Sequence, residues 1–152
     1  MTLVEKASAL ATEAHKGQVD KAGRKYIEHP AYVASKVTTN EEKATAWLHD
    51  VVEDTEITLS YLREDGFPDT VVDAVGTLTH LGGLSYDEYI RRIAKNPIAR
   101  AVKIADLEHN MNLNRLSVVL DTDKKRVEKY RSALEYLCSY HATPVAVTLQ
   151  SS

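Results

Sequence analysis

The chain has 152 residues, of which 43% are hydrophobic and 27% charged, as in one soluble globular domain with a core of its own. Its net charge of −3, with histidine neutral, excludes a global positive field of the kind that attracts nucleic acid or anionic lipid. Cys138 is the only cysteine, so no intrachain disulfide can form and a reducing compartment is expected. The first residues carry acids and lack a long apolar run, so we expect a cytoplasmic protein with neither signal peptide nor membrane span.

The beginning of the chain carries the signals of two helices separated by a polar loop. Thr2 and Glu5 have the spacing of a capping box, and apolar residues follow at helical intervals. Residues 17–25, "GQVDKAGRK", contain two glycines among polar residues, which predicts a loop. Pro30 directly follows His29 and suits the first turn of the next helix. We therefore expect His29 where a loop meets a helix.

The middle of the chain predicts a series of helices, each with its own start signal. Asn40 can cap a helix whose apolar stripe runs through residues 46–55, "AWLHDVVEDT". Thr58 can cap the next helix, and Pro68 can open the one after it. Ser85 stands three residues before a glutamate, which is a second capping-box pair.

The last third of the chain predicts two long helices and a tail. Pro97 can open a helix over "IARAVKIADLEHNM", and Asp123 can cap the last one. Only "TPVAVTL", residues 143–149, has strand character, and it has no obvious partner. We therefore expect one compact all-α domain over residues 1–141 and a tail over residues 142–152.

Four polar side chains interrupt the apolar segment at residues 46–55. Residues four apart share one face of a helix, so a continuous helix would place His49 above Glu53 and Asp50 above Asp54. Carboxylates this close repel one another unless a cation or protons intervene. A divalent metal resolves the conflict, because it binds imidazole nitrogen and carboxylate oxygen directly.

Further ligands have to come from other parts of the chain. His29 stands just before a proline, and Asp106 is set among apolar residues in "KIADLEHNM", with Asn110 one turn later. His29, Asp106 and the pair His49–Asp50 would supply two imidazoles and two carboxylates and leave positions open for water and substrate. This donor set suits Mn²⁺, with Fe²⁺ or Mg²⁺ as weaker candidates, better than a closed tetrahedral zinc site.

Simpler explanations exist for each residue alone. An acid-rich helix end is usually a solvated surface, and its carboxylates could do no more than form ion pairs with Lys43 or Lys103. His29 could be an ordinary cap, and Asp106 could bind backbone amides. None of these explanations covers all four candidate ligands together. The remaining histidines are expected to be exposed or locally hydrogen-bonded: His15, His80, His109 and His141.

The order of these motifs resembles a known enzyme family. A histidine, then "HD", then a later aspartate on an all-α chain is similar to the HD-domain metal phosphohydrolases. More specifically, "AHKGQVDKAGRKYIEHP", "LHDVVEDT" and "VKIADLEHNM" resemble, in that order, the hydrolase domain of the RelA/SpoT superfamily, whose stand-alone versions are the small alarmone hydrolases. The motifs cover residues 14–111. The resemblance implies an HD-domain fold and an enzyme that removes pyrophosphate from the ribose 3′ position of guanosine tetra- and pentaphosphate.

The resemblance also implies a role for each motif residue. It assigns four ligands to a metal ion, usually Mn²⁺: His29, His49, Asp50 and Asp106. Glu53 and Asp54 match the acids that orient or deprotonate the attacking water, and Asn110 matches a residue that contacts the nucleotide. From their charge, Lys21 and Arg24 are expected to bind the phosphates.

The chain departs from the family pattern at three positions. Asp20 replaces an arginine that packs beside the guanine base, Leu113 replaces a small hydroxyl residue, and His80 stands where a lysine is common. All three lie in the implied substrate pocket, so the resemblance predicts the reaction type more firmly than the nucleotide. The alternatives are a phosphomonoesterase or phosphodiesterase for another nucleotide, and a helical module that senses a nucleotide without hydrolysing it. In each case we expect a small phosphorylated nucleotide as partner, no nucleic acid and no membrane, and the oligomeric state stays open.

Overall fold

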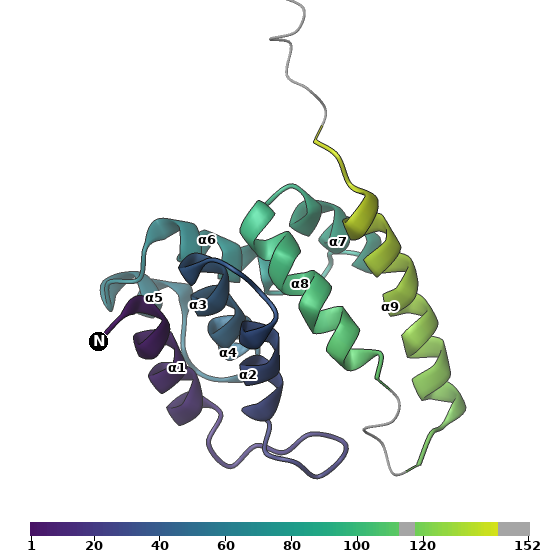
Figure 1. Ribbon diagram of the computed structural model, residues 1–152, viewed down its shortest axis with the longest axis horizontal. Coiled ribbons are helices and arrows are strands. Elements are labelled where there is room, and N and C mark those ends of the chain that lie inside the picture. The colour runs from purple at the N-terminus through teal and green to yellow at the C-terminus, as the bar shows by residue number, and fades with distance from the viewer. Residues whose placement is uncertain (113–117, 143–152) are drawn as a thin grey trace, which may run out of the picture.

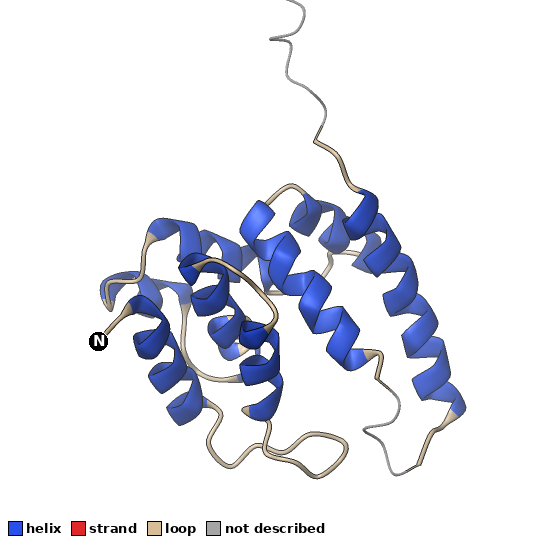
Figure 2. Cartoon of the chain, in the orientation of Figure 1, coloured by secondary structure: helices blue, strands red, loops and turns tan. Residues whose placement is uncertain are grey.

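The computed structural model describes residues 1–112 and 118–142, and within these ranges it consists of helices joined by turns and loops (Figures 1 and 2). The helices are α1 (Leu3–Ala14), α2 (Glu28–Ser35), α3 (Asn40–Leu48), α4 (Val51–Asp54), α5 (Leu59–Glu64), α6 (Asp69–Leu78), α7 (Tyr86–Ala94), α8 (Pro97–Asn110) and α9 (Asp121–Ser139). An isolated antiparallel bridge between Val19 and Lys25 closes the loop between α1 and α2. The predicted all-α fold is confirmed.

Helix α3 lies at the centre and packs against α1, α2, α6 and α8 (Figure 1). One buried cluster lies mainly on α1, α3 and α6 and includes Leu48 and Val75. The other joins α2, α7, α8 and α9 and includes Val33, Ile93 and Leu107. Each of these side chains is 0% exposed, and full burial of one contributes about 1.5–3 kcal/mol to folding. These contacts hold α2, α3 and α8 against one another, which is the framework of the site described below.

Most of the predicted helix starts are confirmed by hydrogen bonds. The reciprocal capping box of Thr2 and Glu5 is present, and the side chains of Thr58 and Ser85 accept the expected backbone N–H groups. Two predictions were displaced. The cap of α3 is Thr39, one residue before Asn40, because the Thr39 hydroxyl accepts the Glu42 N–H while the Glu42 carboxylate binds the Thr39 N–H.

The start of α9 shows the second displacement. The cap position belongs to Leu120, and Asp123 lies in the first turn, where its carboxylate accepts the Leu120 N–H. Asp123 therefore stabilises the helix start from inside the helix rather than from before it.

The prediction of one continuous helix through residues 46–55 is wrong. Helix α3 ends at Leu48 and α4 begins at Val51. The Ala46 carbonyl oxygen, which a continuous helix would give to the Asp50 N–H, accepts the His49 N–H and the His49 Nδ1–H instead. This tightening turns His49 into the interior.

Two predictions lie outside the described residues: the strand-like segment 143–149 and the departure at Leu113. The boundary between a domain at residues 1–141 and a tail at residues 142–152 stays a prediction. Among the described helices, none combines the length and the apolar character needed to cross a membrane.

Candidate metal centre

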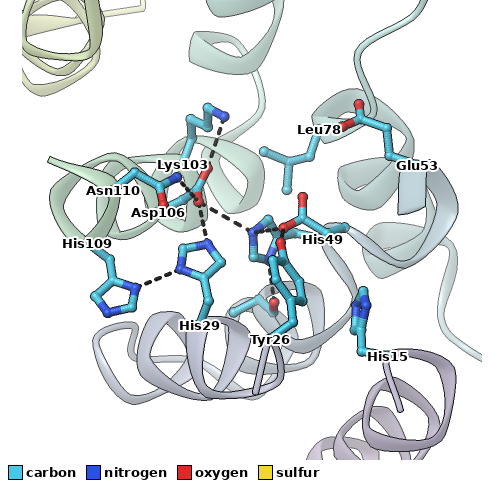
Figure 3. A network of polar contacts seen from close by, with 12 residues as sticks. His15, Tyr26, His29, His49, Glu53, Leu78, Lys103, Asp106, His109 and Asn110 are labelled. Atoms are coloured by element: carbon cyan, nitrogen blue, oxygen red, sulfur yellow. Dashed lines mark hydrogen bonds and ion pairs between the residues drawn. The ribbon is translucent and has the colours of Figure 1, made fainter. Parts of the chain in front are cut away.

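Two helices and one helix junction bring three side chains together. His29 lies in the first turn of α2, His49 at the junction of α3 and α4, and Asp106 in the C-terminal half of α8. Each offers a ligand atom, and these atoms all lie within 4.8 Å of one another. Asp106 Oδ1 lies 2.7 Å from His29 Nε2 and 3.5 Å from His49 Nε2 (Figure 3). Three of the four predicted ligands therefore form a cluster that could bind a metal ion.

The cluster is almost completely buried. The exposed fraction is 4% for His29, 3% for His49 and 4% for Asp106. Helices α2, α3 and α8 pack pairwise, and the three side chains meet where the helices converge. A buried carboxylate costs several kcal/mol unless positive charge compensates it. Lys103 supplies one positive charge beside Asp106, and a second carboxylate, Asp50, lies on the other side of His49.

The Nε2 atom of His49 marks the place where a positive charge is required. Because Nδ1 lies 2.6 Å from the Ala46 carbonyl oxygen, Nδ1 carries the hydrogen, and the lone pair of a neutral ring is left on Nε2. That Nε2 is buried without a hydrogen-bond partner, yet it lies 3.1 Å from Asp50 Oδ2 and 3.5 Å from Asp106 Oδ1. A lone pair facing two carboxylates requires a proton or a cation between them.

The electrostatics of His49 agree with this geometry. Burial by itself lowers the pKa of His49, but the Asp50 and Asp106 carboxylates outweigh it and raise that pKa well above its ordinary value. In chemical terms, the surroundings attract a positive charge to Nε2. A divalent cation bound by imidazole and carboxylate supplies such a charge, so the residues present fit a metal ion.

Asp106 is held by polar partners on its own helix. Lys103 Nζ donates to Oδ2 at 2.9 Å, and Asn110 Nδ2 donates to Oδ1 at 3.0 Å. Burial raises the pKa of Asp106, but the charge of Lys103, the His29 hydrogen bond and the nearby His49 ring lower it well below its ordinary value. Burial lowers the pKa of Lys103, but the Asp106 charge outweighs burial and raises that pKa above its ordinary value. The carboxylate is therefore ionised, with Oδ1 directed at both imidazoles.

Asp50, the fourth predicted ligand, lies beside the cluster rather than within it. Its Oδ2 is 3.1 Å from His49 Nε2 and accepts the Tyr26 hydroxyl. Burial and the Asp50 charge both raise the pKa of Tyr26, so the phenol keeps its proton and donates it in this bond. Burial raises the pKa of Asp50, but the neighbouring His49 lowers it to about 2. Asp50 is thus an ionised carboxylate within reach of the position that Nε2 faces.

Glu53 and Asp54 lie on α4, outside the cluster. In Figure 3, Glu53 is set apart from His29, His49 and Asp106, and its Oε1 accepts the His80 N–H. Asp54 is exposed at its side chain, and its carbonyl oxygen accepts from Gln18. Burial, followed by the charges of Asp50 and Glu53, raises the pKa of Asp54. A raised pKa makes Asp54 a better proton acceptor than an ordinary aspartate.

The predicted phosphate-binding cations lie on the loop between α1 and α2. Lys21 Nζ lies 3.4 Å from Asp123 Oδ1, and Arg24 lies 3.9 Å from Glu28. Both cations have side chains that are 63% exposed. Their role as substrate-binding residues, like that of Asn110, stays a prediction.

Two of the departures from the family pattern have local structural roles. Asp20 Oδ1 accepts the N–H groups of Ala22 and Arg24, so this acid shapes the tip of the loop. The His80 ring stacks on Tyr89 with 4.4 Å between ring centroids, and its Nε2 lies 2.7 Å from a carbonyl oxygen. The expectation of a local hydrogen bond is confirmed for His80.

Two residues at the site were not predicted as structural partners, Tyr26 and His109. Lys103 was considered as a partner for the acids of residues 46–55, and it pairs with Asp106 instead. Lys103 and His109 stand three residues before and after Asp106, so helical spacing alone places them on its face of α8. His109 was expected to be exposed or locally bonded, but its ring reaches His29 on α2. The spacing was a usable signal, whereas the partner on another helix was not visible in the sequence.

Known proteins resemble this chain in sequence and in fold. No family profile matches it. It is 34% identical over 150 residues to a probable GTP pyrophosphokinase of Mycobacterium leprae, covering 90% of this chain and 18% of that protein. It is 31% identical over 144 residues to a guanosine-3′,5′-bis(diphosphate) 3′-pyrophosphohydrolase of Haemophilus influenzae, covering 85% and 20%. It is 30% identical over 138 residues to the bifunctional (p)ppGpp synthase/hydrolase SpoT of Escherichia coli, covering 81% and 19%.

The chain thus spans about a fifth of the length of these curated relatives. A solved structure described as a metazoan orthologue of SpoT that hydrolyses ppGpp has the same fold, with a TM-score of 0.74. That likeness covers 93% of this chain and 89% of the other at 21% sequence identity.

Proposed function

This chain belongs to the RelA/SpoT-type hydrolase domains, and from that premise we propose that it is a metal-dependent nucleotide pyrophosphohydrolase. Its proposed reaction removes pyrophosphate from the ribose 3′ position of guanosine tetra- or pentaphosphate, or of a related phosphorylated nucleotide, with Mn²⁺ as the preferred ion. With the tetraphosphate, one water molecule is consumed and the products are guanosine diphosphate and pyrophosphate. A cytoplasmic location is part of the same proposal.

The observation that carries the proposal is the buried Nε2 of His49, which makes no hydrogen bond and faces two carboxylate oxygens. A purely structural histidine at this position would donate a hydrogen bond from Nε2 to one of those carboxylates. Its Nδ1 could not do so, because Nδ1 is hydrogen-bonded to the Ala46 carbonyl oxygen. His29, His49 and Asp106 would hold the ion, with Asp50 as the fourth ligand. When bound, a divalent ion lowers the pKa of a water molecule and offsets the charge of phosphate oxygens.

The surrounding residues of the chain orient these ligands. Lys103 binds Asp106 Oδ2 and thereby leaves Oδ1 for the site, and the Tyr26 hydroxyl holds Asp50 in the same way. Such outer partners fix the orientation of ligands and tune their basicity. Tyr26, Lys103 and their two carboxylates therefore form a preorganised frame for the ion.

Glu53 and Asp54 are the proposed water-activating pair. The His80 N–H holds the Glu53 carboxylate in one orientation, and the raised pKa of Asp54 favours proton uptake. One of them accepts the proton of the attacking water, and the other orients that water. This division of roles keeps proton transfer separate from metal binding.

The proposal is tested with purified protein stripped of metal by a chelator. Guanosine tetraphosphate is offered without metal and with Mn²⁺, and the release of guanosine diphosphate and pyrophosphate is followed by chromatography. We expect turnover only with the added ion. Absence of hydrolysis with Mn²⁺, Fe²⁺ and Mg²⁺ alike would contradict the proposal for this nucleotide.

One observation favours a second candidate substrate class. Asp20 is an acid on the loop that carries Lys21 and Arg24, and its carboxylate is engaged with backbone N–H groups of that loop. The loop therefore offers no cation at this position for a guanine base. A panel of 3′- and 2′-phosphorylated nucleotides with different bases, compared by kcat/KM, separates an alarmone hydrolase from a hydrolase of another nucleotide.

A further inference from the structure

A third histidine touches the metal cluster from outside. His109 stands three residues after Asp106 on α8, and its Nδ1 lies 2.6 Å from the Nδ1 of His29 on α2 (Figure 3). The other nitrogen of His29, Nε2, is the one that lies 2.7 Å from Asp106 Oδ1. His29 is therefore held at one nitrogen by the cluster and at the other by His109.

The two rings meet edge to edge in nearly one plane. Their planes differ by 9° and their centroids lie 4.9 Å apart, while the two Nδ1 atoms are only 2.6 Å apart. This geometry suits an N–H···N hydrogen bond directed along the lone pair of the acceptor. Tyr32, one turn after His29 on α2, covers the face of His109 with 4.1 Å between centroids and 15° between planes. The His109 ring is thus fixed by stacking and is aimed at His29.

The hydrogen bond sets which nitrogen of His29 carries the proton. A metal ion takes a bare nitrogen, so a neutral His29 that binds through Nε2 must carry its proton on Nδ1. Nδ1 then donates, and His109 Nδ1 accepts. In the state without an ion, the contact of 2.7 Å with Asp106 is best satisfied by a proton on Nε2, and then His109 must donate to His29 Nδ1.

Only some side chains can serve both states. A carboxylate or a backbone carbonyl, the usual outer partner of a metal-binding histidine, accepts but cannot donate. An imidazole can do either, by changing its tautomer. We propose that His109, stacked on Tyr32, is a positioning residue that holds the His29 ring in both tautomers and so presents Nε2 to an incoming ion. The inference rests on the proposed metal centre.

The test measures binding of Mn²⁺ alone to chelator-treated protein, by the electron paramagnetic resonance signal of the free ion. His109→Phe keeps an aromatic ring for Tyr32 but has no nitrogen, and we expect its affinity to fall by about 10–100-fold. His109→Gln can both accept and donate through its amide, and we expect an affinity within a few-fold of wild type. His141→Phe, at an exposed histidine away from the site, is the matched control and should leave the affinity unchanged.

The outcomes separate the two proposals. If wild type binds Mn²⁺ and His109→Phe binds it equally well, His109 does not position His29. If His109→Phe and His109→Gln lose the same affinity while both keep the wild-type circular dichroism and melting temperature, the effect is one of shape and the hydrogen-bonding role is wrong. If wild type binds no Mn²⁺ at all, the proposed function fails and the inference falls with it.

Discussion

The buried cluster and the loop between α1 and α2 both carry residues of the predicted site, but the fold holds them very differently. His29, His49 and Asp106 are at most 4% exposed, and three packed helices fix them. Lys21 and Arg24 are 63% exposed at their side chains, and acids of the protein itself lie within 4.0 Å of both. A buried group in the wrong position is costly, whereas an exposed cation can exchange one partner for another at little cost. With the proposed function as premise, this contrast predicts that removing a cluster residue affects the reaction itself and that removing a loop cation affects only nucleotide affinity.

The largest effect is expected from removing a ligand of the cluster. His49→Gln should lose the bound ion and reduce turnover by more than about 100-fold, beyond the loss usual for an outer partner. Metal content measured on the purified variant, together with nucleotide hydrolysis, checks this outcome. His141→Gln is the control, and full metal content in His49→Gln would remove His49 from the site.

A loss of turnover without loss of metal is expected from Glu53→Gln. The amide keeps the size of the side chain and still accepts the His80 N–H, but it cannot take up a proton. Turnover should fall by about 10²–10⁴-fold while metal affinity stays the same. If Glu53→Gln hydrolysed the nucleotide at the wild-type rate, Asp54 alone would remain as the proton acceptor.

The buried pair of Lys103 and Asp106 predicts an effect on stability. Lys103→Met leaves an uncompensated carboxylate, which should lower the free energy of unfolding of the metal-free protein by about 3 kcal/mol. Saturating Mn²⁺ supplies positive charge to the same carboxylate and should recover part of this loss. Denaturant titrations with and without Mn²⁺ measure both values. Lys125→Met, at an exposed lysine of α9, is the control for the removal of a charge.

The smallest effect is expected on the loop. Lys21→Ala removes an exposed cation, so KM for the nucleotide should rise by about fivefold while kcat stays unchanged, corresponding to about 1 kcal/mol. Steady-state kinetics at two salt concentrations measure the difference. A decrease of about 100-fold in the turnover number would contradict the proposed contrast, because it would give the loop a part in the chemistry.

Local signals in the sequence predicted the helices and their caps. The features that the sequence did not predict depend on tertiary contacts. Thr2, Thr58 and Ser85 cap their helices because a hydroxyl and a backbone N–H three residues later are fixed by the chain itself. The break at His49 was missed because it depends on the imidazole turning inward to a carbonyl oxygen of its own helix and facing Asp106 of α8. No periodicity in residues 46–55 reports that event.

The same holds for the candidate site: its proposed ligands were predicted from the sequence, whereas the roles of the residues around them were not. The motif pattern identified His29, His49 and Asp106, since these residue types have few other reasons to stand among apolar neighbours. Lys103 and His109 were within one turn of Asp106, but their roles depend on a buried charge and on a ring of α2, which only packing brings near.

Three buried side chains from distant parts of the chain are proposed to bind one divalent ion: His29, His49 and Asp106. A crystal soaked in Mn²⁺ and measured for anomalous scattering tests this proposal most directly. We expect a single strong peak within bonding distance of His29 Nε2, His49 Nε2 and Asp106 Oδ1. A map without density at that point, with His49 Nε2 still facing the two carboxylates, would contradict it.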